Sequence, residues 1–544
     1  MTTSRALILV FLLTILAYSN TLNGEFQFDD DLSVKENPYV TGSSRLSWDN
    51  ISQNAVSGVR PFTSITFALN YRLGGFDVRW YHLTNIVIHL LNGLLLFVLV
   101  LQTFRSPKLP SFYSDAAETA AFFSSAIFLL HPIQTQAVSY ISQRSELLVS
   151  LFFLCALLAY IKAVNSENKI NSFLLYSAAA FCLLFAIGSK EIAVTIPVVM
   201  LMYDLCFLRD RPLLKRIAFP CMLLLLSLIA GFYVLANMSG PNAGFSTTAF
   251  TPLQYLMTQF RVIVTYLRLL ILPVDQNLDY HFRTSRSLFE PDTALSLLFI
   301  LGLLTFAAVS FKKWRIGSFF ILWFFIILAP TSSIVPVIDP IYEHRVYLAS
   351  AGLFIVFAGL LSVHLSPLFT GQAGSFSRGE GCNLFPPLRG GDEGEGDVCG
   401  ITNDRISKRE SSRYRKPAVI TIVLLLLLLS VLTFQRNKVW QTKLALWEDV
   451  VKKSPMKSRP HNNLGNCYML LGDHLRAVEE YKKAITLDKD NIEAYYNLGM
   501  NLEKTGRSGE AVFYYDIFVR NAPAVYAEQR QAVLEHIKEI RQDK

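Results

Sequence analysis

The feature that most limits the fold of this chain is a series of apolar segments long enough to cross a lipid bilayer. About twenty consecutive apolar residues span the hydrocarbon core as a helix. Hydrophobic residues make up 52% of the 544 residues and charged residues only 17%, which is too apolar for a soluble chain of this length. We therefore predict an all-α, polytopic helical membrane protein. Eleven spans are expected, at about 6–22, 80–102, 117–138, 145–163, 172–189, 192–208, 215–236, 293–311, 316–335, 346–366 and 417–434.

A further apolar segment, 254–273, is not counted as a span. Gln254, Thr258, Arg261, Thr265 and Arg268 recur at steps of four and three, which places them on one stripe of a helix. A helix with two arginines on such a stripe suits the membrane surface or the wall of a wet cavity better than contact with lipid. We predict an interfacial helix over 254–273.

The distribution of basic residues predicts the orientation. With eleven spans and the N-terminus inside, all strong basic clusters fall in loops on one side, which the positive-inside rule makes cytoplasmic. The loop 23–79, the stretch 237–292 and the C-terminal tail then share the non-cytoplasmic face. The net charge of +8 is thus an orientation signal, and no nucleic-acid partner is expected. The clusters are Arg105 and Lys108, Lys162 and Lys169, Arg209 to Arg216, Lys312 to Arg315, and Arg405 to Lys416.

Two features carry little chemical information. The seven cysteines are scattered and form neither a disulfide framework nor a CxxC pair, so no metal site is predicted. The loop 367–416 is rich in glycine and charge and has no periodicity. We expect a disordered cytoplasmic insertion there.

The chain becomes polar and repetitive after the last span. Asn463-Leu464-Gly465 recurs as Asn497-Leu498-Gly499, a displacement of thirty-four residues that is typical of tetratricopeptide repeats. We predict a membrane domain over 1–436 and a repeat domain, an α-solenoid, over 437–544. The repeat domain is expected to hold a half-repeat at 440–456, full repeats at about 457–490 and 491–524, and a capping helix at 526–541. Such helical pairs bind peptides or proteins on their concave face.

The first loop contains an acidic cluster directly after the first span. Asp29, Asp30 and Asp31 follow Phe28 at the predicted water edge of the membrane. The cluster can be a solvated loop that helps to set topology. It can also be catalytic, because paired carboxylates raise one another's pKa and such a group can take a proton from a hydroxyl.

Polar residues within and between the spans favour the catalytic interpretation, since ionisable groups in a membrane are functional candidates. His82, Asn85, His89 and Asn92 share one face of the second span. Each histidine alone could make an interhelical hydrogen bond; as a stripe they are expected to line a cavity. The outer turns are chemically rich, although pairs such as Lys190 and Glu191 could be structural salt bridges. They supply Arg60, His131, Arg144, Glu146, Lys190, Glu191, Glu343 and Arg345.

In this order the motifs resemble a family of membrane glycosyltransferases. The chain is similar to the transmembrane and tetratricopeptide-repeat protein O-mannosyltransferases, which have the GT-C fold, and to their bacterial relatives. The resemblance rests on Phe28-Asp29-Asp30, Arg60-Pro61, Tyr81-His82 with Asn85, His89 with Asn92, His131-Pro132, Arg144 with Glu146, Ser189-Lys190-Glu191, Tyr266 to Pro273, Glu343 with Arg345 and Tyr347, and the repeats.

The resemblance implies transfer of a sugar, mannose, from a polyprenyl-phosphate carrier to a Ser or Thr hydroxyl of an acceptor protein recruited by the repeats. Asp29 or Asp30 would be the general base, and the third acid, Asp31, leaves the assignment open. The candidates for the lipid phosphate are arginines, whose planar fork matches phosphate oxygens, and a lysine: Arg345, Arg261 and Arg268, followed by Arg144 and Lys190. Arg60, His82, Asn85, His89, His131, Glu146, Glu191 and Glu343 would line the cavity.

Other implications concern the setting of the reaction. The donor is a lipid-linked sugar in contact with membrane lipid, no further cofactor is implied, and a divalent metal is not indicated. Having only two to three repeats suggests a bacterial or archaeal protein at the plasma (inner) membrane.

Two other classes of membrane protein share part of this pattern. A lipid-linked glycan ligase would have many spans but usually a large outer loop late in the chain, whereas the long outer loop here comes early. A non-catalytic membrane-anchored repeat scaffold would need neither the acids of the first loop nor the histidine stripe.

The basic loops generate a prediction about topology. Cysteines introduced at Ser43 and at Thr486 should both react with a membrane-impermeant thiol reagent added to intact cells, because 23–79 and 435–544 are expected on the same outer side. The control is a cysteine at Lys312, which should react only after permeabilisation. Labelling of only one of the two outer positions would show that the span count is wrong.

Overall fold

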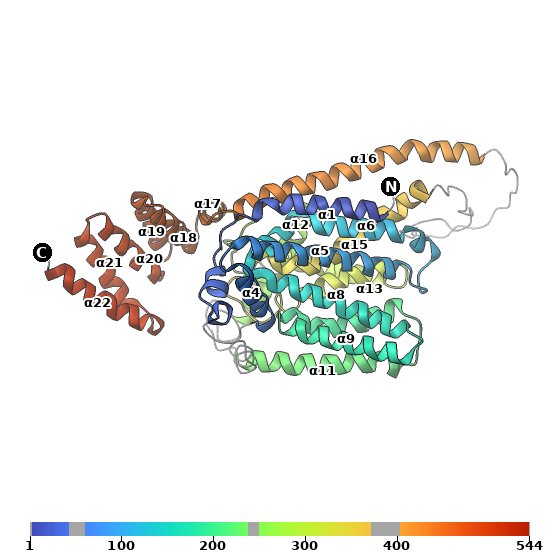
Figure 1. The fold of residues 1–544 in the computed structure, drawn as a ribbon, viewed down its shortest axis with the longest axis horizontal. Helices are drawn as coiled ribbons and strands as arrows, with labels where there is room; N and C mark the ends of the chain where they lie inside the picture. The colour runs from blue at the N-terminus through green and yellow to red at the C-terminus, as the bar shows by residue number, and fades with distance from the viewer. Residues whose placement is uncertain (1–2, 43–59, 238–249, 371–402, 543–544) are drawn as a thin grey trace. The chain divides into compact units, whose positions relative to one another are not determined.

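The computed structural model describes residues 3–42, 60–237, 250–370 and 403–542, and most of these are helical, with no β-strand among them (Figure 1). Contacts divide the chain into two units. The membrane unit contains Met1–Leu22, Asp29–Pro273 and Thr284–Arg436. The repeat unit contains Asn437–Lys544 together with two short segments, Asn23–Phe28 and Val274–Arg283. The division falls between Arg436 and Asn437, where the boundary was expected, and the difference is that these two loop segments group with the repeats.

Long apolar helices build the membrane unit. Within the described residues, eight helices are long and apolar enough to cross a membrane, and the number is nine if one bent pair counts as a single span. The eight are Thr3–Thr21, Val78–Phe104, Ile141–Asn165, Lys169–Ile187, Leu213–Phe232, Pro291–Ser310, Glu343–Val363 and Ile420–Trp440. The chain is therefore an all-α membrane protein, as predicted, but the count of eleven spans is not confirmed.

Three predicted spans account for the difference. The span expected at 117–138 is the bent pair, α6 (Ser111–Leu130) followed by Pro132–Ser139, with an angle of 52° between them. The bend falls at His131-Pro132, where a proline ring disfavours continuous helix. The spans expected at 192–208 and 316–335 are α10 (Ile196–Phe207) and α14 (Arg315–Leu328), with 12 and 14 residues. At about 1.5 Å per residue these helices are shorter than a hydrocarbon core of about 30 Å.

The centre and the rim of the membrane unit differ in burial. Helices α5 (Val78–Phe104), α6, α8 (Arg144–Asn165) and α15 (Tyr347–Thr370) pack together and are rich in buried residues. Helices α1 (Thr3–Tyr18), α9 (Lys169–Ile187), α11 (Leu213–Asn237) and α13 (Pro291–Ser310) run alongside them and expose large apolar side chains (Figure 1). Such faces suit contact with lipid.

The predicted interfacial helix is α12, Pro252–Ile271, and it is not one of the eight long apolar helices. It begins at a capping box, in which Thr251 and Gln254 satisfy each other's backbone N–H groups. Its buried face carries Tyr255, Gln259 and Tyr266 at steps of four and seven. The hydroxyl of Tyr255 and the amide of Gln259 bind the carbonyls of Thr331 and Pro340, so polar groups also hold this buried face.

The basic loops gather at one end of the membrane unit. Asp210 accepts from Lys108 at 2.8 Å and from Arg216 at 3.2 Å, and Arg315 donates to the carbonyl of Lys108. Helix α6 starts at this end and runs for 20 residues, about 30 Å, towards Pro132. This grouping of basic loops agrees with the expected distribution of charge. The assignment of this end to the cytoplasmic side stays a prediction.

Part of the predicted disordered loop 367–416 lies outside the described residues, which omit 371–402. Its two ends are helical: α15 extends to Thr370, and α16 (Asn403–Asn437) continues the apolar helix backwards. This corrects the expectation for the ends, because extending an existing helix needs no new nucleus. Residues 43–59 of the first loop and 238–249 of the later one are also outside the description.

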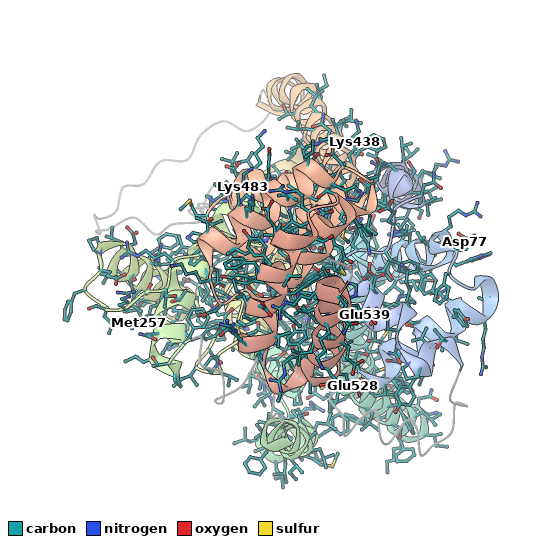
Figure 2. All side chains as sticks on the ribbon, turned by 90° about the vertical axis from the view of Figure 1, so that its left-hand side faces the viewer. Asp77, Met257, Lys438, Lys483, Glu528 and Glu539 are labelled. Atoms are coloured by element: carbon teal, nitrogen blue, oxygen red, sulfur yellow. The ribbon has the colours of Figure 1, made fainter. Side chains whose placement is uncertain are left out.

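The repeat unit consists of paired helices. Helix α17 (Lys443–Lys453) precedes the pairs α18 (Ser458–Leu470) with α19 (His474–Leu487), and α20 (Ile492–Lys504) with α21 (Ser508–Asn521), and α22 (Ala527–Gln542) follows. The repeated glycine has a steric role, because a Cβ on Gly465 or Gly499 would lie 2.6 Å from the ring of Tyr481 or Tyr515. Lys483, Glu528 and Glu539 are exposed on this unit (Figure 2).

This packing generates a prediction about repeat stability. Gly465→Ala should destabilise the repeats by about 1–3 kcal/mol, because the added methyl overlaps the Tyr481 ring. Limited proteolysis of the full chain should then cut within α18 and α19 about fivefold to a hundredfold faster. Gly302→Ala in α13 is the matched control, since a Cβ there meets no atom within 4 Å. Equal cleavage rates in the two variants would contradict the packing argument.

Candidate functional site

The three acids of the first loop occupy different environments. Asp30 is fully buried, and its Oδ1 accepts the backbone N–H of Ser142 at 2.6 Å and the Ser142 hydroxyl. Asp29 is half-buried, and its backbone N–H donates to the hydroxyl of Tyr140 at 2.9 Å. Asp31 pairs with Lys35 one turn later, at 2.8 Å. The acid segment is therefore held by side chains more than a hundred residues away.

Tyr140 lies between α7 (Thr135–Ser139) and the turn Ile141–Gln143, outside the spanning helices. Burial, with the carboxylates of Asp29 and Asp30 nearby, raises the pKa of Tyr140 well above its usual value. The phenol therefore stays protonated at neutral pH. A protonated hydroxyl beside Asp29 can donate a hydrogen bond to a carboxylate or to a bound substrate.

Arg144 begins α8 two residues after Ser142 and is fully buried. Its Nε donates to Asn85 Oδ1 at 2.7 Å, its Nη2 to the carbonyl of Tyr81 at 2.9 Å, and its Nη1 to Thr66 Oγ1 at 3.3 Å. Its guanidinium also lies 4.5 Å from the centre of the Phe67 ring. Since at least three of its five N–H groups bind the protein, Arg144 is a structural anchor more than a phosphate ligand.

A second charged group surrounds the first turn of α8. Lys190 pairs with Glu146 at 2.6 Å, and both side chains are buried. Arg60 donates to Ser145 Oγ at 2.9 Å and lies 3.5 Å from Glu191, and both members of that pair are about half-exposed. Lys190 and Glu146 are therefore an internal ion pair, whereas Arg60 and Glu191 can meet solvent or a ligand.

The pKa values of Lys190 and Glu191 are both lowered, but for different reasons. Burial lowers the pKa of Lys190 below its usual value, and the nearby Arg60 acts in the same direction. For Glu191, partial burial acts to raise the pKa, but Arg60 and Lys190 together outweigh it and lower it. Glu191 therefore stays ionised at neutral pH beside Arg60.

Arg345 is buried in the turn before α15. Its Nη1 and Nη2 donate to the carbonyls of Pro340 and Asp339 at 2.9 and 3.1 Å, and its guanidinium lies 5.2 Å from the Tyr342 ring centre. The adjacent His344 backbone N–H donates to Gln136 Oε1 at 2.7 Å, which ties this turn to α7. Glu343 is also buried here. Arg345 is close enough to Glu191 for its charge to help lower the pKa of that carboxyl.

The stripe of His82, Asn85, His89 and Asn92, which was expected to line a cavity, is buried among the helices. His89 bonds to the hydroxyl of Tyr347 at 2.7 Å and to the carbonyl of Leu129 at 3.1 Å. His131 bonds to the carbonyl of Leu270 at 3.1 Å, and His82 is buried with them. Asn85, His89 and Asn92 of the stripe make interhelical hydrogen bonds, as polar groups inside a membrane need partners.

The two arginines of α12 are placed separately. Arg261 lies 3.9 Å from Asp292, at the start of α13, and Arg268 is exposed. Nine of the other predicted residues lie around the turn that leads into α8. Those brought together there are Asp29, Asp30, Arg60, Asn85, Arg144, Glu146, Lys190, Glu191 and Arg345.

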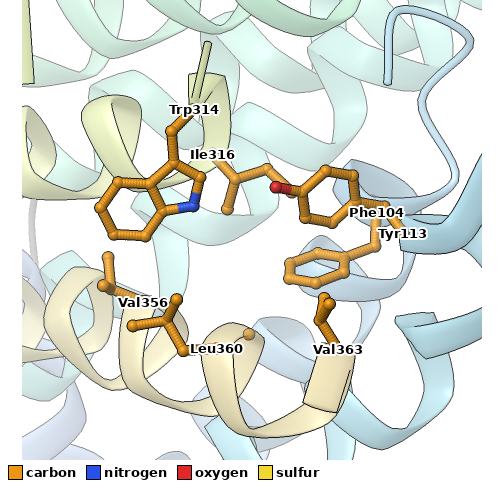
Figure 3. Close-up of a pocket in the computed structure, with 8 residues that line it drawn as sticks. Phe104, Tyr113, Trp314, Ile316, Val356, Leu360 and Val363 are labelled. Carbon is orange, nitrogen blue, oxygen red and sulfur yellow. The ribbon is translucent and has the colours of Figure 1, made fainter. Parts of the chain in front are cut away.

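An apolar pocket lies near the basic loops and has a different character. Its lining contains Phe104, Tyr113, Trp314, Ile316 and Leu360, from the ends of α5, α6, α14 and α15 (Figure 3). No carboxylate is among the described residues that line it. In the part of the chain that the structure describes, no three His, Cys, Asp or Glu side chains are grouped to hold a metal ion.

Sequence reasoning missed the direct partners of the acids. Tyr140 and Ser142 contact Asp29 and Asp30, yet neither belongs to a periodic stripe. The one signal available was their position two to four residues before Arg144. A polar turn entering a helix is a common place for such contacts, but the sequence does not say which distant segment it meets.

The buried ion pair generates a prediction. Glu146→Gln should destabilise the detergent-solubilised protein by about 3–5 kcal/mol, because it leaves the Lys190 ammonium buried without a counter-charge. The double variant Glu146→Gln with Lys190→Met should recover most of the loss, since both charges are then removed. Thermal unfolding measures the effect. A single variant as stable as the double one would show that the pair is not a coupled unit.

Comparisons with known proteins agree with both units. Residues 465–506 match the family described as TPR repeat, and residues 492–521 match the family described as tetratricopeptide repeat. These matches lie within α18 to α21. They confirm the repeat fold that the thirty-four-residue period predicted.

Similarity to named proteins extends over almost the whole chain. Protein O-mannosyl-transferase F38B6.6 of Caenorhabditis elegans is 28% identical over 89% of this chain and 63% of its own length. Protein O-mannosyl-transferase Tmtc3 of Drosophila melanogaster is 23% identical over 96% of this chain and 59% of its own length. Human protein O-mannosyl-transferase TMTC1 is 25% identical over 89% of this chain and 55% of its own length. The chain thus spans between half and two thirds of the length of these relatives. Over nearly its whole length, the chain is therefore similar to proteins that are named protein O-mannosyl-transferases, and it shares the repeats.

Proposed function

We propose that this chain is a membrane glycosyltransferase that moves mannose from a polyprenyl-phosphate carrier to a Ser or Thr hydroxyl of a protein. The names of its relatives support a protein O-mannosyl-transferase. One structural observation carries the proposal. Asp30 binds Ser142 and Arg60 binds Ser145, so a carboxylate pair and a half-exposed cation are anchored within about one helical turn of each other.

The two acids are proposed to have separate roles. Asp29 is the general base, because its side chain is only half-buried and can meet a substrate hydroxyl. Asp30 is a positioning residue, since its Oδ1 is occupied by two hydrogen bonds from Ser142. Tyr140, which stays protonated, orients this segment through its hydroxyl.

The proposed reaction balances as a single displacement. The acceptor hydroxyl gives its proton to the Asp29 carboxylate while its oxygen bonds to C1 of the mannosyl group. The bond from C1 to the phosphate oxygen breaks, and the polyprenyl phosphate leaves with the electron pair. The leaving group gains negative charge, so a nearby cation stabilises it in the transition state.

The cation next to the acid turn is Arg60, which keeps about 40% of its side-chain surface exposed. We propose Arg60 as a phosphate ligand, with Arg345 close by and with Arg261 and Arg268 of α12 as further candidates. Arg144 and Lys190 are proposed to hold the scaffold, because both are buried and bound to other protein groups. The charge of Glu191 beside Arg60 helps to orient the guanidinium.

The setting of the reaction is part of the same proposal. The acid segment and the repeats are proposed to face the non-cytoplasmic side of the plasma membrane, where the repeats hold the acceptor protein. Tetratricopeptide repeats are protein-binding modules, which supports a role for the repeats in binding the acceptor protein while the membrane unit performs the transfer.

The proposed roles generate a prediction about catalysis. Asp29→Asn should lower mannosyl transfer by about a hundredfold to ten-thousandfold, because the amide cannot accept the proton. Asp31→Asn is the matched control, since that carboxylate is already paired with Lys35 at 2.8 Å. The assay is transfer of labelled mannose from a polyprenyl-phosphate donor to an acceptor protein by the purified full chain.

The same assay can separate this proposal from a scaffold without chemistry. A scaffold would show no transfer in the wild type and no difference between the variants. If Asp29→Asn and Asp31→Asn are equally active, Asp29 is not the base. Asp30→Asn should retain more activity than Asp29→Asn, because its Oδ1 can still accept from Ser142.

A further inference from the structure

The two short segments in the repeat unit adjoin proposed site residues in the chain. Asn23–Phe28 ends one peptide bond before Asp29, and Val274–Arg283 begins shortly after α12, which carries Arg261 and Arg268. The repeat unit therefore includes the segment that directly precedes the acids and the segment that follows helix α12 with its two arginines.

Asp279 anchors the second segment to the repeats. Its carboxylate is buried and receives a two-pronged contact from Arg459, with Nε to Oδ2 at 2.8 Å and Nη2 to Oδ1 at 2.6 Å. Lys457 also pairs with it. Nearby, Asn277 Nδ2 donates to Ser454 Oγ at 2.9 Å. Bidentate arginine contacts with a buried carboxylate are strong and geometrically specific.

Backbone groups tie the first segment to the turn before α17. The N–H of Glu25 donates to the carbonyl of Gln441 at 2.9 Å, and the Glu25 carboxylate accepts the N–H of Lys443 at 3.0 Å. Gln27 Nε2 donates to the carbonyl of Trp440 at 3.2 Å. This segment is therefore a part of the repeat unit and not a loose loop.

Phe28 is the last residue of that segment, and Arg459 reaches it as well. The Arg459 guanidinium lies 5.7 Å from the centre of the Phe28 ring, and the ring meets Trp447 edge-on with centres 5.6 Å apart. Phe28 has a φ of 41°, a left-handed conformation that residues other than glycine rarely adopt. Such a conformation persists where the surroundings hold it, and here the ring contacts do so.

We propose that Asp279 is a positioning residue for the acid segment: by holding Arg459 against Phe28, it fixes the residue that precedes Asp29. This inference rests on the proposed function and deepens it. The alternative is that Asp279 only attaches its own loop to the repeats.

The test compares Asp279→Asn with Asp516→Asn in the full chain. Asp516 is the matched control, because it also pairs with an arginine, Arg541, but on α21. Hydrogen exchange of residues 25–31 should become about tenfold faster or more in Asp279→Asn, since a charge-assisted contact is lost. Exchange in α18 to α21 should stay unchanged, which shows that the repeats remain folded.

The activity readout separates positioning from binding. Mannosyl transfer by Asp279→Asn should fall on the order of a hundredfold in kcat, because small misplacements of a base are costly, while the KM for the donor stays the same. Phe28→Leu should show the same pattern with Asp279 intact. A disulfide between Asn277→Cys and Ser454→Cys, introduced into Asp279→Asn, should not restore activity, because it re-attaches the loop without the carboxylate that holds Arg459. Restored activity would support the alternative and overturn the inference.

The outcomes distinguish the two proposals. Unchanged exchange of residues 25–31 in Asp279→Asn would overturn the inference whatever the activity. Faster exchange with a kcat equal to that of Asp516→Asn would also overturn it, while leaving the proposed function intact. Absence of transfer in the wild type would refute the proposed function, and with it the catalytic role of Asp279; the exchange result would then still show whether Asp279 holds the segment.

Discussion

The buried guanidinium of Arg144 is the interaction on which the rest of the candidate site depends. A charge in an apolar interior persists only if its hydrogen-bonding groups are satisfied. Arg144 meets this requirement through α4 (Pro61–Gly74) and α5, with Asn85 and the carbonyl of Tyr81 as its closest partners. These bonds place the first turn of α8, and the residues on either side of Arg144 in sequence, Ser142 and Ser145, hold Asp30 and Arg60. One anchored arginine thus sets the positions of an acid and a cation.

This arrangement explains how residues on an extended loop can support chemistry. Catalytic groups need positions that are reproducible to a fraction of an ångström, and loops alone seldom supply them. Here the loop is fixed from two directions. The turn before α8 holds Asp29 and Asp30 through Tyr140 and Ser142, and the repeat unit holds the preceding residues. The segment is therefore a scaffolded part of the protein, although it lies between helices.

Sequence reasoning was most successful where a pattern repeats over many residues. The thirty-four-residue period predicted the helical pairs, and the polar stripe of 254–273 predicted a helix apart from the long apolar ones. The histidine stripe shows the limit of this approach. Periodicity correctly indicates that His82 and His89 share a face, but it does not say whether that face meets water or the carbonyl of Leu129. The predicted number of spans has the same weakness, because hydropathy alone does not show that a helix ends after 12 or 14 residues.

By itself, the sequence determined that this is an all-α membrane protein with repeats, and it singled out the acids and most of the cations of the candidate site. Only the tertiary structure decided that Asp30 is buried and bonded while Asp29 is half-buried, that Arg144 is an anchor, and that Asp279 belongs to the repeats. The reason is the range of the forces involved. Apolar content and helical period are local properties that a short window reveals. The bonds of Asp30 to Ser142 and of Arg459 to Asp279 join residues 112 and 180 positions apart, and only the packing of whole helices brings them together.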